Sequence, residues 1–177
     1  MSASRHEPQP VLLAELGFAA RFIVWAARQW IQLGDPCGNT ARRLADAFDA
    51  ARAPRALGAL DAVLAMLASH ARRRLDFRTA GDIVVGRDER ALLELLGAIQ
   101  AQRDDLGDGR VSEDRAATVV ALGWTGDVAA RRLAPRLADL AGELAAAGLW
   151  LAVSPTARLC LMPSVPESTA GAQPALH

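Results

Sequence analysis

The chain has 177 residues, a length typical of one domain, and a domain of this size can fold without disulfides or bound metal. Hydrophobic residues make up 51% of it and charged residues 23%, which excludes an intrinsically disordered chain. Basic and acidic residues number 20 each, so no overall field attracts nucleic acid or acidic lipid. Every basic residue is arginine, and the lack of lysine excludes Schiff-base and P-loop lysine chemistry.

The first predicted helix, residues 11–33, is long enough to raise the question of a membrane span, but Arg21 and Arg28 would be costly in lipid. One broad face of this helix is apolar, which is typical of a helix packed on a core. A second stripe, aromatic, runs along the opposite side among those arginines. Its members are Phe18, Phe22 and Trp25. Two interpretations stay open: other helices of the domain cover this stripe, or it forms an interface with a subunit or partner.

Helix signals recur after the turn at 34–36. Asn39 or Thr40 is a suitable N-cap for a second helix. Pro54 is a suitable first residue for a third helix, because proline lacks the amide hydrogen that the first turn leaves unpaired. This third helix ends near His70, a residue type that is stabilised by the negative C-terminal end of the helix dipole.

The middle of the chain combines a short irregular stretch with another helix. Two short strands are expected at 75–77 and 83–85, where apolar residues flank turn residues. Asp88 and Glu89 then open an amphipathic helix, where acidic residues suit the first turn. We expect the carboxylates of the chain to lie on solvent-facing sides of the helices.

The C-terminal half has the element order of a winged helix. Helices are expected at 112–122 and 127–147, and a β-hairpin is expected from strands at 149–153 and 158–162. The predicted fold class is therefore mainly α, a compact domain of about six helices with a short C-terminal hairpin. The domain is expected to span residues 11–162, between flexible tails at 1–10 and 163–177. The first of these tails does not have the pattern of a signal peptide.

Four arginines would carry DNA binding if the winged-helix interpretation holds: Arg131, Arg132, Arg136 and Arg158. A recognition helix should present arginine, lysine, asparagine or glutamine to base edges. The helix at 127–147 instead offers mostly alanine with Asp139 and Glu143, and acidic groups repel the phosphate backbone. Nucleic acid is therefore a possible but disfavoured partner.

A second basic cluster follows the third predicted helix. It consists of Arg72, Arg73, Arg74 and Arg78. Cations suit a helix C-terminus, so a solvated helix end explains the cluster. The alternative is a patch that binds an acidic partner, because arginine makes bidentate contacts with carboxylates and phosphates.

The sequence shows no catalytic, metal or cofactor site. The histidines are far apart in the sequence, and the two cysteines, Cys37 and Cys160, form no paired motif. The loop that starts at Asp104 resembles a calcium loop but has Leu106 at the third position and Arg115 at the twelfth, where oxygen ligands are needed. An enzyme whose site the sequence does not reveal stays an alternative.

Three stretches carry a resemblance: 22–30, 67–78 and 86–93. With them the chain is similar to uncharacterised small helical proteins of alphaproteobacteria. Relatives often carry cysteines just before the Asp88–Glu89 pair, where this chain has Ile83-Val84-Val85. The resemblance implies a helical fold and a cytoplasmic location in a bacterium, and it implies no activity.

The function predicted from the sequence is that of a non-enzymatic interaction, adaptor or regulatory protein, acting on a protein partner or on itself as a homodimer. The predicted interface is the aromatic stripe with arginines at its rim, namely Phe18, Arg21, Phe22, Trp25 and Arg28. No membrane association is expected. A winged-helix transcriptional regulator is the second interpretation, and an enzyme is the third.

Overall fold

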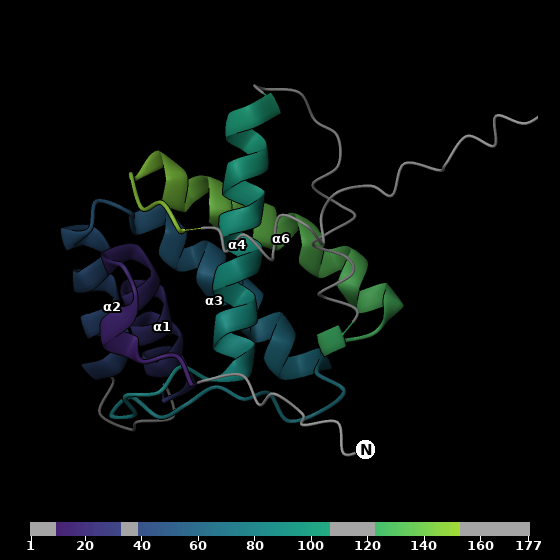
Figure 1. Ribbon diagram of the computed structural model, residues 1–177. Coiled ribbons are helices and arrows are strands. Elements are labelled where there is room, and N and C mark those ends of the chain that lie inside the picture. Colours follow the sequence, from purple (N-terminus) through teal and green to yellow (C-terminus); the bar gives the residue numbers. More distant parts are fainter. Residues whose placement is uncertain (1–9, 33–38, 107–122, 153–177) are drawn as a thin grey trace, which may run out of the picture.

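The computed structural model describes residues 10–32, 39–106 and 123–152, apart from the side chains of 104–106. The described part is mainly helical, as predicted (Figure 1). Its elements are η1 (Leu13–Glu15), α1 (Phe18–Ile31), α2 (Asn39–Ala50), α3 (Pro54–His70), α4 (Arg87–Leu106) and α6 (Asp127–Ala146). Pro54 is the first residue of α3 and Asp88 and Glu89 lie in the first turn of α4, as predicted. α2 already begins at Asn39, one of the two residues predicted to cap it.

Three helices form the centre of the fold. α3 packs along α6, and α4 packs against α6 and α1, while α1 and α2 pack together beside α3 (Figure 1). Trp30 on α1 adds a polar link, because its indole nitrogen donates a hydrogen bond to Asp61 on α3 at 2.7 Å. Each of the three central helices, α3, α4 and α6, contacts at least two other helices.

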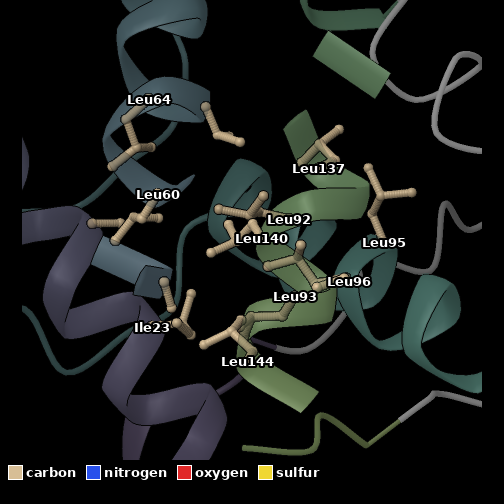
Figure 2. Close-up of a cluster of buried hydrophobic side chains, with 14 of the residues drawn as sticks. Ile23, Leu60, Leu64, Leu92, Leu93, Leu95, Leu96, Leu137, Leu140 and Leu144 are labelled. Atoms are coloured by element: carbon tan, nitrogen blue, oxygen red, sulfur yellow. The ribbon is translucent and has the colours of Figure 1, made fainter. Parts of the chain in front are cut away.

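The core is built from aliphatic side chains at helical spacing. Figure 2 shows Leu60 and Leu64 of α3 facing Leu137 and Leu140 of α6, with leucines of α4 against them. Residues three or four apart share one face of a helix, so each helix contributes a continuous apolar stripe. Ile23 joins α1 to the same cluster. Burial of these side chains is the main force that holds the helices together.

The first predicted helix is divided in the structure. A 3₁₀ turn comes first, and Gly17 in extended conformation precedes α1. The Glu15 carboxylate accepts a hydrogen bond from the Leu12 amide at 3.0 Å, which closes the short turn. The residues before this turn pair with a distant part of the chain, so they do not continue the helix.

The predicted strands at 75–77 and 83–85 are wrong for the described residues, which contain a single isolated bridge between Leu12 and Val84. Two backbone hydrogen bonds flank this bridge, from Leu13 to Ile83 and from Val85 to Val11. In the segment at 71–86, several other backbone groups bond to side chains instead of to a strand: Arg28 of α1 and Asp88 and Glu89 of α4 are their partners. We call this segment the stapled loop.

α6 continues through Pro135 and does not break there. Gly148 follows the helix with φ of +76°, the left-handed conformation that glycine adopts at low cost. Gln100 of α4 then holds the chain after α6: its amide donates to the carbonyls of Ala141 and Leu149, and its oxygen accepts from the Leu151 amide at 2.8 Å. This buried glutamine fixes where the C-terminal segment leaves the helices.

The predicted helix at 112–122, the second hairpin strand at 158–162 and most of both tails lie outside the described residues. Of the first hairpin strand at 149–153, residues 149–152 are described and are not in a strand. Arg158, Cys37, Cys160 and the calcium-like loop from 107 onward lie outside them as well. Among the described helices, none is long and apolar enough to cross a membrane.

Candidate functional site

A buried ion pair joins Arg28 of α1 to Glu89 of α4. Each side chain is 1% exposed. The guanidinium donates from Nε and Nη2 to the two carboxylate oxygens, both at 2.8 Å. Glu89 also accepts the backbone amides of Arg78 at 3.0 Å and Gly86 at 2.7 Å. Four donors therefore saturate this carboxylate, which offsets the cost of burying its charge.

Asp88, the preceding residue, repeats this arrangement. Arg73 donates to both of its oxygens, at 2.6 and 2.7 Å. The Trp124 indole nitrogen donates at 2.9 Å and the Asp76 amide at 2.7 Å, so this carboxylate also accepts four hydrogen bonds. Burial alone would raise the pKa of Asp88, but the bonds from Arg73, Asp76 and Trp124 lower that pKa to about 2.

Together the two carboxylates determine the path of the stapled loop. Arg28 uses its remaining donors on the carbonyls of Asp82 at 2.5 Å and Val84 at 2.8 Å. Asp76 accepts the Arg87 amide at 2.7 Å, which closes the loop onto the start of α4. A Cβ at Gly86 would collide with the Asp76 carbonyl, so this close approach requires glycine. The loop thus has a defined path without strands.

The prediction that Arg28 lies at the rim of an exposed interface is wrong. Its neighbours from α4 and the stapled loop surround the guanidinium, and the hydrogen bonds from it to Glu89 raise its pKa above the ordinary value. The expectation that carboxylates lie on solvent-facing sides is also wrong for Asp88 and Glu89, which are both 1% exposed. One sequence signal could have found Glu89: at the third helical position, a glutamate often returns to the amide of the N-cap, here Gly86.

The other predicted interface residues do share one face of α1. Phe18 is 63% exposed and stacks on Phe22 with ring centroids 6.1 Å apart, and Phe22 stacks on Trp25 at 6.0 Å. Phe48 of α2 meets Phe22 edge-on at 4.8 Å, so α2 covers part of the stripe. Arg21 is exposed beside these rings. We call Phe18, Arg21, Phe22 and Trp25 the aromatic face.

The predicted acidic-partner patch is partly neutralised within the molecule. Arg73 binds Asp88, and the Nε of Arg78 lies 3.1 Å from an Asp76 oxygen. Arg72 and Arg74 are exposed. Residues from Arg74 to Asp82 surround a hollow of about 370 Å³ on the stapled loop. All four arginines are exposed, but two of them, Arg73 and Arg78, are already in ion pairs within the molecule.

The arginines of the DNA-binding interpretation that the structure describes, Arg131, Arg132 and Arg136, are exposed on α6. Asp139 and Glu143 follow them along the same helix. Arg136 also lines a second hollow, between α3, α4 and α6, together with Arg55 and other residues. Nothing in the sequence indicated that these two arginines line the same hollow.

Within the described ranges, no group of three or more histidine, cysteine, aspartate or glutamate residues could hold a metal ion. Protein-family models, curated protein sequences and solved structures were all compared with the chain, and none matches it. The resemblance to small alphaproteobacterial proteins therefore stays a prediction.

The Arg28–Glu89 pair can be tested by removing its cation. We expect Arg28→Met to lower the free energy of unfolding by about 3–5 kcal/mol, because Glu89 would stay buried with a charge that no cation balances. Urea unfolding followed by circular dichroism measures this loss. Arg132→Met, at an exposed position of α6 outside the aromatic face, is the control and should change the stability by less than about 0.5 kcal/mol. Equal effects of the two variants would contradict a structural role for the pair.

The lowered pKa of Asp88 makes stability depend on pH. A carboxyl whose pKa falls on folding stabilises the protein above its unfolded pKa, here 3.8, and loses that contribution as the pH falls toward about 2. We expect about 2 kcal/mol of stability from this source. Urea unfolding of wild type and Asp88→Asn between those pH values measures it: the difference between the two proteins should shrink as the pH falls. A difference that does not change with pH would refute this assignment.

Proposed function

We propose that the protein is a non-enzymatic interaction and regulatory protein that acts through the aromatic face of α1. The observation that carries this proposal is the exposure of Phe18, a residue that is 63% accessible although its ring continues a row of stacked rings. Aromatic side chains with a neighbouring arginine are the residues most enriched at protein interfaces. Arg21 lies one helical turn from Phe18 and supplies that cation.

The aromatic face is held in place before any partner binds. Phe22 is fixed between Phe18, Trp25 and Phe48, and Ile23 and Arg28 anchor the opposite side of α1 in the core. Ordering side chains during association reduces affinity, so rings already locked by packing bind at lower entropic cost. This rigidity supports a binding role for the aromatic face.

A second copy of this chain is the partner we propose for the aromatic face. The formal net charge is zero, so two copies do not repel each other at long range. Arg21 on α1 and Asp49 on α2 are both exposed, on the two helices that pack at Phe22 and Phe48, and neither forms an ion pair with another described residue. A two-fold axis through the aromatic face would let Arg21 of each copy approach Asp49 of the other.

The oligomeric state tests this proposal. We expect wild type to be a dimer and Phe18→Asp to be a folded monomer, because the substitution places a charge in the interface and removes little from the core. Light scattering after size-exclusion chromatography measures the mass, and circular dichroism verifies the fold. Val128→Asp is the matched control, since Val128 is also an exposed apolar side chain, 71% accessible, but on α6. A wild-type monomer at all concentrations would rule out the second copy as the partner.

A second candidate function, a winged-helix transcriptional regulator, is favoured by the exposed Arg131, Arg132 and Arg136 on one helix. The acidic Asp139 and Glu143 further along α6 weaken it.

We expect only weak binding to duplex DNA, unaffected by Arg131→Gln/Arg132→Gln, because the acidic part of α6 opposes the phosphate backbone. Fluorescence anisotropy with a labelled duplex at about 50 and 200 mM salt measures this binding. Tight binding that falls steeply with salt and is lost in the double variant would favour the regulator over the interaction protein.

A further inference from the structure

We infer that the hollow between α3, α4 and α6 binds a small zwitterionic molecule, one that carries a phosphate or carboxylate beside a protonated amine. The hollow measures about 420 Å³, within the size range of small-molecule sites. Its charged lining consists of Arg55, Arg103, Arg136, Asp139 and Glu143. We call it the arginine hollow, and it shares no residue with the aromatic face.

Small residues on facing helices leave the space that forms the hollow. Gly58, Ala59 and Ala62 of α3 line it, and Gly142 of α6 lines it from the other helix. Residues three and four apart lie on the same side of a helix, so the small side chains of α3 fall on one strip. Leucines at such positions would fill the space, as they do in the core beside it. The room for a ligand therefore follows from the choice of glycine and alanine.

Arg103 reaches this space from the last turns of α4. Its guanidinium lies over Gly142 at the position where a Cβ would otherwise stand. A side chain at 142 would have to displace the guanidinium. The glycine thus permits a cation of a third helix to enter the hollow.

The charges around the hollow form two sets. Arg55 on α3, Arg103 on α4 and Arg136 on α6 bring cations from three helices. Asp139 and Glu143 lie one turn apart on α6 and supply anions. Arg55, Arg136 and the two carboxylates make no hydrogen bond or ion pair with other described residues, so their donors and acceptors are open to a ligand.

These two sets select the class of ligand. Arginines match the oxygens of a phosphate or carboxylate and bind them through paired hydrogen bonds. A polyanion without a cation would meet repulsion from Asp139 and Glu143. A molecule with an anionic group and an ammonium can satisfy both sets, because its ammonium faces the carboxylates while its oxygens face the arginines. O-phospho-L-serine has both groups and serves as the principal probe, with L-glutamate as its carboxylate counterpart.

Isothermal titration calorimetry with these two probes tests the inference. We expect at least one to bind wild type with a Kd below about 1 mM, and Arg55→Gln or Arg136→Gln to weaken binding about tenfold or more. Arg132→Gln is the matched control, since Arg132 is exposed on α6 but does not line the hollow. Gly142→Ala should also weaken binding, because it displaces Arg103. Circular dichroism verifies that each variant is folded.

Three outcomes overturn the inference. The first is the absence of heat with both probes at about 10 mM. The second is binding that Arg136→Gln leaves unchanged. The third is equal affinity for O-phospho-L-serine and inorganic phosphate in wild type, which would mean that the carboxylates do not recognise an amine. Asp139→Asn provides an internal comparison: it should lower affinity for the zwitterion while leaving affinity for phosphate the same or higher.

Discussion

The rest of the structure depends on two adjacent buried carboxylates, Asp88 and Glu89, each held by an arginine and by backbone or indole N–H groups. Isolated charges in a protein interior are strongly unfavourable, and well-packed apolar side chains could join the helices at least as firmly. What apolar contacts cannot do is determine the path of a loop that forms no sheet. Here the loop supplies donors to the carboxylates and carbonyls to Arg28, so its path is fixed by satisfied hydrogen bonds.

The same network orients α1. Arg28 holds one side of this helix against α4 and the stapled loop, while Ile23 and Val24 pack into the apolar core. The opposite side then faces outward with Phe18 and Arg21. Phe48 of α2 packs against Phe22, so the aromatic face is anchored at its centre, while Phe18 at its N-terminal end is exposed. Stacked rings that are anchored in the fold and exposed at one end are expected of an interaction surface. This arrangement supports the function that we propose.

The arginine hollow arises from a different part of the fold. α3 and α6 pack tightly where leucines face each other, as Figure 2 shows for Leu60, Leu64, Leu137 and Leu140. Beside this contact the residues become glycine and alanine, and the helices leave a space that arginines border. One pair of helices therefore provides both the core and a polar hollow, depending on side-chain size. The hollow and the aromatic face involve different charged residues, so each can be altered without changing the other.

The sequence by itself determined the helices, because apolar spacing, the N-terminal position of Pro54 and the acids that open α4 are local signals. It also placed Phe18, Phe22 and Trp25 on one face, which follows from helical periodicity alone. Tertiary structure decided the rest. Arg21 and Arg28 look alike in the sequence, yet only Arg28 meets a carboxylate that lies 61 residues further along the chain. The expected strands at 75–77 and 83–85 do not form, because side chains of distant helices bond to the backbone of that segment. Arg55, Arg103 and Arg136 line one hollow although they lie on three different helices. Local patterns specify which residues share a face, whereas the partner of that face depends on how distant helices pack.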